Sequence, residues 1–366
     1  MRITLSKTDL LSAFQKIQSI VPTKAQMPIL SNVLLLALQD ELTITATDLT
    51  ISMKITLPAK VVEEGAIVLS SKRLAALIRE LTSHEVEIAT TPFHVAMIYS
   101  GSSQFKIPGM NPADFPEVPT LWDGLQVQFP TTLLRDMLAK TAFSAGRDET
   151  RPIFSSIHLH KNDSSTVFTG ADGKRVARTF TDLPLTSEWQ GSFILPIRAA
   201  EEIIRLLDTK EETVTLHFLD GKVSVQVGPV VLVSQLLSGQ YPDISRIIPE
   251  KQPSSINLHR EELMTLLRQV SLFTSTDRTS IRFTFSPGEL HLSITGSEAG
   301  EGHVSMPINY QGERLDVAFN PTFFLDILRH SKDETVQLNL KDGYNPGLIT
   351  DSSSSLYVLT PMRLDN

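Results

Sequence analysis

Three sets of polar residues in this chain carry side chains that enzymes use in catalysis or metal binding. Asp172-Gly173-Lys174-Arg175 combines a glycine with cations, but it lacks the glycine spacing of a phosphate-binding loop, so a β-turn is the better interpretation. His158 and His160 alternate along a predicted strand and face one side, but a zinc site needs a third protein ligand and none is evident nearby. Residues 352–355 are serines without the Gly-x-Ser-x-Gly turn of a nucleophile elbow. The sequence therefore predicts no catalytic residues, no metal site and no cofactor.

Arginine recurs at one place in a longer pattern. Arg79, Arg205 and Arg329 each close a segment with helical periodicity, and a strand that begins near a valine follows each of them. On one isolated helix, such a residue would belong to an ordinary solvated surface. Its return at intervals of about 125 residues indicates a shared electrostatic role, which attraction to phosphate without base recognition would fit. The chain has no zinc-finger spacing, helix-turn-helix pattern or aromatic-rich stacking strand, so any DNA contact is expected to be with the backbone.

The elements that must position these arginines occur three times. Each repeat opens with a strand and an amphipathic helix, continues with hairpin strands, and ends with a second helix and further strands. The second helices are expected at residues 71–79, 197–205 and 320–329, with Ser70 or Ser71 and Asn320 as N-caps. The strands after the opening helices are expected at residues 29–38, 153–160 and 281–285. This order implies an α+β fold of three domains, at residues 1–120, 121–252 and 253–366, each a mainly antiparallel sheet with two helices on one face.

Composition restricts the class of protein further. The chain has 366 residues, which suits two or three hydrophobic cores, and it has no cysteine, which excludes disulfides and thiolate metal sites and is compatible with a reducing cytoplasm. The N-terminus is expected to be a strand rather than a signal peptide, and the longest apolar run, residues 33–38, is too short to span a bilayer. A net charge of −8 does not exclude nucleic-acid binding, because a local basic surface can bind phosphate within an acidic protein.

Six short segments, in order along the whole chain, carry a resemblance to a known family. They are residues 27–32 (Met-Pro-Ile-Leu-Ser-Asn), 47–49 (Thr-Asp-Leu), 112–116 (Pro-Ala-Asp-Phe-Pro), 169–177 (Thr-Gly-Ala-Asp-Gly-Lys-Arg-Val-Ala), 239–243 (Gly-Gln-Tyr-Pro-Asp) and 357–364 (Tyr-Val-Leu-Thr-Pro-Met-Arg-Leu). Together with the triplication, they make the chain resemble the β subunit of bacterial DNA polymerase III, the sliding clamp. The resemblance implies three tandem copies of the DNA-clamp domain, with antiparallel sheets outside and two helices per domain inside. Two such chains would form a pseudo-sixfold ring that encircles duplex DNA, tethers the replicative polymerase and confers processivity without catalysis.

The resemblance also implies partners and contact residues. The expected partners are a second copy of the chain, double-stranded DNA of any sequence, the polymerase catalytic subunit, the clamp loader and other proteins with clamp-binding motifs, with no membrane. The expected location is the bacterial cytoplasm, at the nucleoid during replication. The cations expected to face DNA are Lys24, Arg73, Arg79, Lys140, Arg147, Arg198, Arg205, Arg278 and Arg329. The ring is expected to close head to tail through Phe105 and Ile107 of the first domain and Leu272 and Phe273 of the third, although all four could instead be ordinary core residues.

The family's second site is an apolar cleft that captures short linear motifs of partner proteins. The matching positions are Phe154, Ala171, Gly173, Lys174, Arg175, Val176, Pro242, Arg246, Ile247, Val358, Pro361, Met362 and Arg363. An apolar floor with valine and methionine adapts to varied anchors, while arginine can hold partner carboxylates. Lys174, Phe154 and Thr360 stand where many members of the family have histidine, leucine and methionine, so the peptide preference of this cleft is open.

Two further classes of function remain as alternatives. A nucleic-acid-processing enzyme of the same fold would need clustered Asp and Glu able to hold Mg²⁺ near a basic groove, and no such cluster is evident in the sequence. A scaffold that has lost DNA binding would have no reason to keep an arginine at the same place in every repeat. The noncatalytic clamp is therefore the preferred hypothesis.

Overall fold

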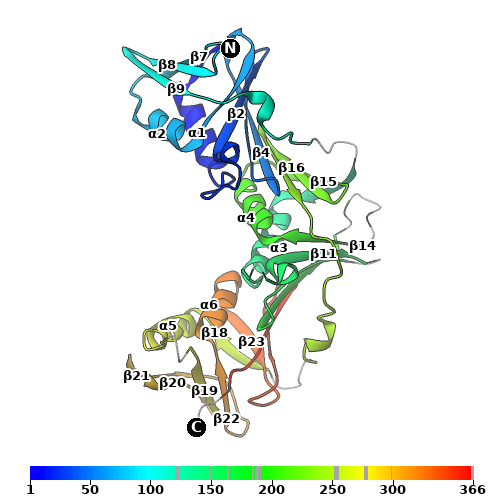
Figure 1. Cartoon of the computed structure of the whole chain (residues 1–366). Coiled ribbons are helices and arrows are strands. Elements are labelled where there is room, and N and C mark those ends of the chain that lie inside the picture. Colours follow the sequence, from blue (N-terminus) through cyan, green and yellow to red (C-terminus); the bar gives the residue numbers. More distant parts are fainter. Residues whose placement is uncertain are drawn as a thin grey trace. The chain divides into compact units, whose positions relative to one another are not determined.

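The computed structural model describes residues 1–119, 124–148, 150–162, 165–183, 185, 189, 191–250, 255–275, 279–297 and 299–363 (Figure 1). It divides into two compact units. Unit 1 comprises Met1–Thr132, Leu185–Ser187 and Arg205–Leu236, and unit 2 comprises Leu133–Pro184, Glu188–Ile204 and Leu237–Asn366. The described residues form six α-helices: α1 (Lys7–Ile17), α2 (Ser71–Glu80), α3 (Thr131–Ala142), α4 (Ile197–Leu206), α5 (Arg260–Ser271) and α6 (Pro321–His330). None of these helices is long and apolar enough to cross a membrane.

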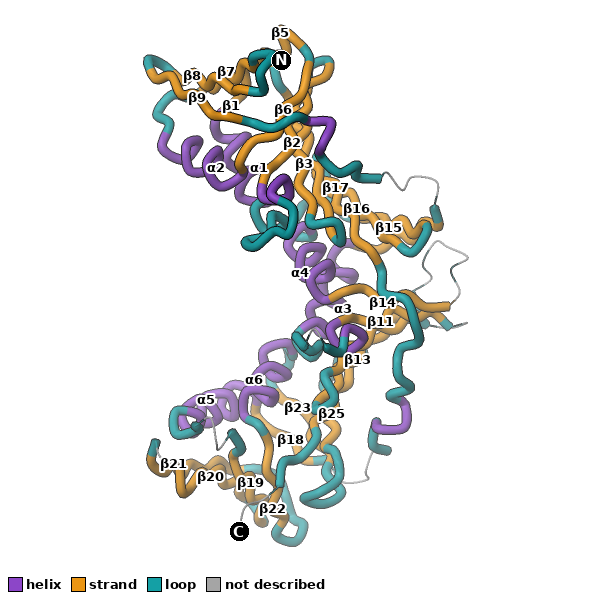
Figure 2. The backbone as a smooth tube through the Cα atoms, in the orientation of Figure 1, coloured by secondary structure: helices purple, strands orange, loops and turns teal. Residues whose placement is uncertain are grey.

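Two antiparallel sheets form unit 1 (Figure 2). Its strands are β1 (Arg2–Ser6), β2 (Asn32–Leu38), β3 (Glu41–Thr47), β4 (Ile51–Pro58), β5 (Lys60–Glu63), β6 (Gly65–Ser70), β7 (Glu85–Thr90), β8 (Val95–Ser100), β9 (Ser103–Pro108), β10 (Leu125–Pro130), β15 (Thr213–Leu219), β16 (Lys222–Val227) and β17 (Val230–Gln235). Five strands follow the order β5-β1-β7-β8-β9, and eight follow the order β10-β15-β16-β17-β4-β3-β2-β6. The larger sheet joins strands of the first and second repeats where β4 pairs with β17, with Met53 opposite Leu232.

Unit 2 repeats this arrangement with other strands. They are β11 (Ser156–Lys161), β12 (Thr166–Ala171), β13 (Arg175–Thr181), β14 (Gly191–Pro196), β18 (Ile256–His259), β19 (Ile281–Ser286), β20 (Glu289–Ser297), β21 (Gly300–Pro307), β22 (Leu315–Phe319), β23 (Thr335–Asn339), β24 (Gly347–Thr350) and β25 (Ser355–Leu359). Eight strands follow the order β14-β11-β12-β13-β25-β24-β23-β18, and four follow the order β21-β20-β19-β22. Here β13 and β25 join the second and third repeats, with Ala177 opposite Tyr357.

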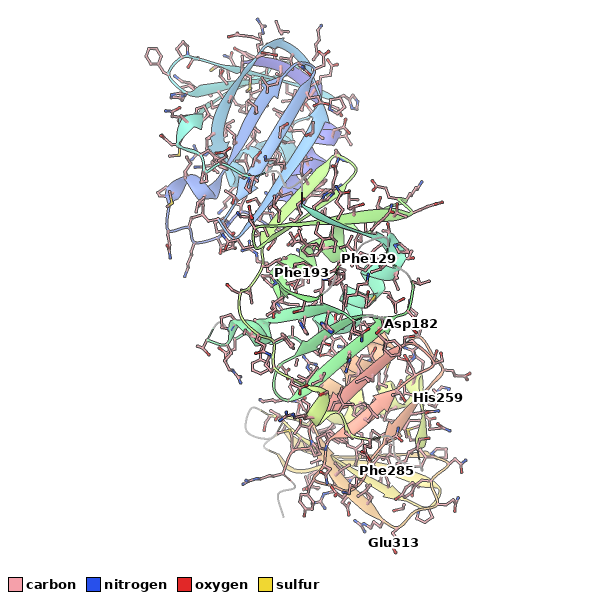
Figure 3. The ribbon with its side chains drawn as sticks, turned by 90° about the vertical axis from the view of Figure 1, so that its right-hand side faces the viewer. Phe129, Asp182, Phe193, His259, Phe285 and Glu313 are labelled. Atoms are coloured by element: carbon pink, nitrogen blue, oxygen red, sulfur yellow. The ribbon has the colours of Figure 1, made fainter. Side chains whose placement is uncertain are left out.

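The helices begin where the sequence predicts. The Ser70 hydroxyl accepts a hydrogen bond from the Arg73 amide at 3.4 Å, and the Asn320 side chain accepts one from the Thr322 amide at 2.9 Å. These side chains satisfy amide groups that have no partner within the first turn of a helix. At the start of α5 the imidazole of His259 (Figure 3) accepts from the Glu262 amide at 3.4 Å. The predicted second helices are therefore confirmed as α2, α4 and α6.

The core of the third repeat shows how helices and sheets pack together. Phe324 of α6 stacks on Phe283 of β19 with ring centroids 5.3 Å apart, and Phe319 meets Phe283 edge-on at 5.4 Å. Phe285 (Figure 3), on the same strand as Phe283, is also fully buried. The same cluster includes Ile349 of β24, so it contains residues of both sheets of unit 2 as well as of α5 and α6. Burying large apolar side chains in one cluster supplies most of the free energy that holds such layers together.

Two local predictions are corrected by the structure. The third repeat contributes strands to two sheets, not to one, and its helices share a core with both. The strands predicted from residues 29 and 153 begin later, at Asn32 and Ser156, because short 3₁₀ turns at Pro28–Ser31 and Pro152–Ser155 precede them. Proline lacks the amide hydrogen that a central strand needs, and it favours the first position of a helical turn.

Candidate functional site

The turn between β12 and β13 forms one edge of the predicted peptide cleft in unit 2. The Asp172 carboxylate accepts hydrogen bonds from the amides of Lys174 and Arg175 at 2.9 and 3.0 Å. Gly173 between them has φ of 86°, the left-handed region that favours glycine. The interpretation of this segment as a β-turn is confirmed, and the turn leaves the Lys174 side chain exposed.

Apolar side chains gather beside this turn. Ala171, Val176, Leu348 and Val358 form a buried cluster, each at most 5% exposed. Partly buried hydrophobic residues pack against the cluster, namely Phe154, Ile244, Ile248 and Leu356. The structure thus brings together Phe154, Ala171, Val176 and Val358 of the predicted set. Sequence reasoning missed four further residues that the structure adds, namely Leu348, Leu356, Ile244 and Ile248. The two isoleucines could have been found, because they lie on either side of the predicted Arg246 and Ile247 in the sequence.

Other predicted cleft residues lie on the surface. Ile247 is 49% exposed and Met362 is 37% exposed, and Pro242 is exposed as well. The Met362 amide donates to the Ala318 carbonyl at 2.8 Å, and the Thr360 amide donates to the Lys174 carbonyl at 3.0 Å. These backbone hydrogen bonds fix the segment that carries Pro361 and Met362. Pro361 is partly buried. Exposed apolar side chains at the edge of an apolar cluster are a surface to which a partner can bind.

Arg175 differs from the other predicted cleft cations because its guanidinium is used internally. It donates to the carboxylates of Asp172 and Asp326 at 3.0 and 2.8 Å and to the Phe143 carbonyl at 2.7 Å. It also lies over the Phe323 ring, 4.3 Å from the centroid, and its side chain is only 10% exposed. Arg175 therefore positions the turn against α6. An arginine that holds a partner carboxylate would have to be one of the exposed arginines instead.

Exposed cations lie on the segments that contribute to the predicted cleft. Arg246 is 86% exposed and pairs loosely with Asp243 at 3.4 Å, and Arg363 is also exposed. Arg151, which sequence reasoning missed, lies over the Phe154 ring at 5.5 Å and pairs with Asp148 at 3.4 Å. The sequence could have indicated Arg151, because it directly precedes the Pro-Ile-Phe segment that carries the predicted cleft residue Phe154. Such side chains can meet an acidic partner at little desolvation cost.

Tyr241 anchors the connecting segment beside the cluster. Its ring stacks on His158 with centroids 4.7 Å apart, and burial raises the pKa of the Tyr241 hydroxyl. Burial also lowers the pKa of His158 to about 4, so the imidazole is neutral near pH 7. The His160 ring lies 5.7 Å from that of His158, and no group of three or more potential metal ligands gathers in the described part of the chain. His158 thus packs against Tyr241, and His160 stacks on His158.

The predicted DNA-facing cations are mostly exposed helix residues. A basic residue occupies the last turn of all six described helices. A cation there also interacts favourably with the helix dipole, so this placement has a structural as well as an electrostatic use. The exposed members of the predicted set are Lys24, Arg73, Arg79, Arg147, Arg198, Arg205 and Arg329, whereas Arg278 lies outside the described residues.

Lys140 does not fit the prediction of a solvent-facing cation, and that prediction is wrong. Its side chain is 8% exposed and pairs with Asp136 at 2.9 Å, while the exposed Lys332 reaches the other oxygen of the same carboxylate at 2.9 Å. Although burial acts to raise it, hydrogen bonds and charge from the two lysines lower the pKa of Asp136. A residue in the last turn of α3 can face inward as easily as outward, and the helical pattern alone does not resolve which.

The residues predicted to contact a second chain also include both exposed and buried side chains. Phe105 lies on the edge strand β9 and is 37% exposed, but Ile107 on the same strand is 4% exposed and belongs to the interior of unit 1. In unit 2, Leu272 caps α5 and is 78% exposed. Phe273 is partly buried against β21, where a Cβ at Gly302 would lie 2.9 Å from its ring. Phe105 and Leu272 are thus the two of the four that are available at the surface.

The antiparallel α+β repeats, with buried helix faces, exposed cations on the helices and a buried apolar cluster beside the β12–β13 turn, define a tandem-repeat protein of the α+β class. Comparison with known proteins identifies the family. The profiles of the N-terminal, central and C-terminal domains of the DNA polymerase III beta subunit match residues 1–119, 128–243 and 245–363. The chain therefore belongs to the DNA polymerase III beta subunit family and consists of three tandem clamp domains.

Individual relatives agree over the full length. A protein of Chlamydia muridarum named beta sliding clamp is 44% identical over 100% of this chain and 99% of its own length. The crystal structure of a sliding clamp from Bartonella birtlesii bound to griselimycin is similar with a TM-score of 0.94 and 26% identity over the whole of both chains. The beta subunit of Thermotoga maritima gives a TM-score of 0.90 and 27% identity, again over both whole chains.

Proposed function

We infer that this chain is a DNA sliding clamp, a noncatalytic accessory subunit that keeps a replicative DNA polymerase on its template. The observation that carries this inference is the match of all three clamp domains, in order, to almost the whole chain. The full-length identity of 44% to a protein named beta sliding clamp supports it. Processivity then comes from linkage to DNA, because tethering converts each rebinding of the polymerase into a local event.

We propose that two chains form a closed ring, with domains at residues 1–120, 121–252 and 253–366 in each. Two of the edge strands support this assembly, β9 in unit 1 and β21 in unit 2, since each has no second neighbour among the described strands. Unpaired edges invite pairing with another chain, and each edge here has an exposed apolar side chain on it or nearby, Phe105 on β9 and Leu272 after α5. A head-to-tail contact of this kind closes into a ring when the rotation between copies is right.

We propose that duplex DNA passes through the ring and contacts the exposed arginines at the helix ends. The acidic total of −8 is compatible with this, since only the DNA-facing surface has to be positive. The apolar cluster of Ala171, Val176, Leu348 and Val358 would then take linear motifs of the polymerase, the clamp loader and other partners. The exposed predicted cleft residues Ile247 and Met362 would supply adaptable apolar contacts.

The first test is the solution mass by light scattering over a dilution series, combined with retention on DNA. A mass near twice 40.5 kDa is expected for the dimer. Clamp loaded with a loader and ATP should stay on nicked circular DNA and be lost when the circle is linearised. A stable monomer, or equal retention on circular and linear DNA, would contradict a topological clamp.

A further inference from the structure

Unit 1 contains a pocket that the proposed function does not use. Its volume is about 440 Å³, within the range of small-molecule and peptide sites. The turn between β3 and β4 forms one wall, with Leu49 and Thr50, and the connector from Pro116 to Pro119 forms another. Lys222 of β16 and Val233 of β17 also line the pocket. The Lys54 ammonium donates to the Val118 carbonyl at 2.8 Å and so holds the connector wall in place.

The turn at this pocket is built like the turn at the peptide cleft of unit 2. The Asp48 carboxylate accepts from the amides of Thr50 and Ile51, both at 2.8 Å. In unit 2, Asp172 accepts in the same way from the residues two and three positions after it. The intervening residue has a left-handed backbone in both turns, with φ of 78° at Leu49 and 86° at Gly173. The two turns are therefore equivalent positions of the repeat.

The strand and the connector next to each turn correspond as well. The Gln235 amide donates to the Thr50 carbonyl at 2.8 Å, and in unit 2 the Thr360 amide donates to the Lys174 carbonyl at 3.0 Å. This register makes Val233 the counterpart of Val358. The connector in each case carries a buried aromatic residue followed by proline, Phe115-Pro116 in unit 1 and Tyr241-Pro242 in unit 2. The pocket of unit 1 thus repeats the residue positions that line the predicted peptide cleft.

The side chains in the pocket define what it can hold. Leu49 is 49% exposed although its left-handed backbone is costly for a leucine, and such strain persists chiefly where a site uses it. Leu49, Val233 and the two prolines offer apolar contact, while Lys222 forms no ion pair with any described residue. The exposed Glu117 also lines the pocket. It lies close enough to Lys54 for the positive charge of Lys54 to offset the negative charge of Glu117. The uncompensated charge of the pocket is therefore the positive one of Lys222.

We propose that this pocket is a second peptide site, which binds an extended segment of a partner protein that carries an aliphatic side chain next to a carboxylate. The aliphatic group would lie between Leu49 and Val233, and the carboxylate would meet the Lys222 ammonium. The class of ligand rests on the proposed function, because it is taken from the equivalent cleft of unit 2. Each chain would then offer two peptide sites, so one clamp could hold two partners or two segments of one partner.

The test uses the full chain with ¹³C-labelled leucine and valine methyl groups. The probes are two acetylated and amidated pentapeptides, Asp-Leu-Val-Leu-Asp and Lys-Leu-Val-Leu-Lys. The reporters are the methyl signals of Leu49 and Val233 for unit 1 and those of Leu348 and Val358 for unit 2. The acidic peptide is expected to shift the Leu49 and Val233 signals with saturation, and the basic peptide is expected to leave them unchanged.

Two variants and one control localise the effect. Lys222→Glu should weaken the binding of the acidic peptide at the unit 1 reporters about tenfold, because it places a like charge beside the peptide carboxylate. Leu49→Asn should weaken it as well, and asparagine tolerates the left-handed backbone, so the turn should survive. Lys60→Glu makes the same charge change on the exposed strand β5 and should leave binding unaltered.

The outcomes separate this proposal from the proposed function. Unit 1 signals that stay fixed up to about 5 mM acidic peptide, while unit 2 signals move, would overturn the second site and leave the clamp function intact. Movement at unit 1 alone would support the second site and contradict the assignment of the unit 2 cleft for this class of peptide. Equal shifts with the basic peptide, or equal weakening by Lys60→Glu, would refute the role of Lys222.

Discussion

The guanidinium of Arg175 connects three segments of unit 2, namely the β12–β13 turn, α6 and the residues after α3. Replacement by leucine would remove the donor 2.8 Å from the Asp326 carboxylate, which keeps its pair with Arg329, and the donor 2.7 Å from the Phe143 carbonyl. Loss of one partner of a largely buried ion pair is costly, so Arg175→Leu should lower the free energy of unfolding by about 2–3 kcal/mol. Urea unfolding followed by circular dichroism measures this change.

Arg246→Leu is the matched control for that experiment. Arg246 has the same side chain in the same predicted cleft, but it is 86% exposed and its ion pair with Asp243 spans 3.4 Å. Exposed pairs contribute little, so this variant should change stability by less than about 0.5 kcal/mol. Equal losses in the two variants would mean that the contacts of Arg175 do not hold the turn against α6.

His158 gives a second prediction at the same scale, in the form of a pH dependence. Burial lowers the pKa of His158 from 6.5 to about 4, so the unfolded chain binds more protons than the folded chain between these values. The free energy of unfolding therefore has its full value above pH 6.5 and decreases as the pH falls toward 4. Because the ring is partly exposed, wild type should lose only about 1 kcal/mol relative to His158→Phe between pH 7 and pH 5.

The measurement is urea unfolding of both proteins at pH 7 and at pH 5, and the quantity of interest is the change in their difference. Phenylalanine keeps an aromatic ring against Tyr241 but cannot titrate, so this variant retains the stacking contact and removes only the titrating group. Parallel losses of stability in the two proteins would show that His158 does not carry the pH dependence.

At the scale of elements, the sequence was sufficient for the helices but not for the sheets. The caps at Ser70 and Asn320 and the apolar stripes predict α2 and α6 because these signals lie within a few residues of each other. The pairing of β4 with β17 joins segments more than 150 residues apart, and no local pattern encodes such a partner. The orientation of Lys140 and the burial of Ile107 were missed for a related reason, because both depend on which neighbours arrive from elsewhere in the chain.

The end of α5 carries the prediction that belongs to this scale. Leu272 caps the helix with 78% of its surface exposed, next to the unpaired edge of β21. If this element forms the contact with a second chain, Leu272→Asp would place a charge in an apolar interface and should give a folded monomer that is not retained on circular DNA. Light scattering gives the mass and circular dichroism gives the fold.

Leu183→Asp provides the comparison for Leu272→Asp. Leu183 is likewise an exposed leucine of unit 2, at 54%, but it follows β13 rather than an unpaired edge near α5. This variant should remain a dimer with normal retention on DNA. A dimeric Leu272→Asp protein, or a monomeric Leu183→Asp protein, would place the interface elsewhere.

For the whole molecule, the question is how a chain of net charge −8 stays on a polyanion. If two chains form the proposed closed ring, no tight contact with DNA is needed, and a weak electrostatic attraction confined to the surface that faces DNA is sufficient. The recurrent arginines at the ends of α2, α4 and α6 are the candidates for that surface, although each position also favours the helix dipole. Removing their charge together distinguishes the two uses.

The triple variant Arg79→Gln, Arg205→Gln, Arg329→Gln keeps good helix-forming residues and removes three charges. If all three arginines contact phosphate, the slope of log K against log salt for binding a short duplex should become shallower by up to about 3, because fewer counterions are released. The control triple Lys60→Gln, Arg314→Gln, Lys341→Gln changes the net charge equally, but its positions lie on strand β5 and in two loops rather than on helices. Its slope should stay close to that of wild type. Equal effects of the two triples would show that DNA responds to the total charge of the protein, and the recurrence of arginine would then reflect helix stability alone.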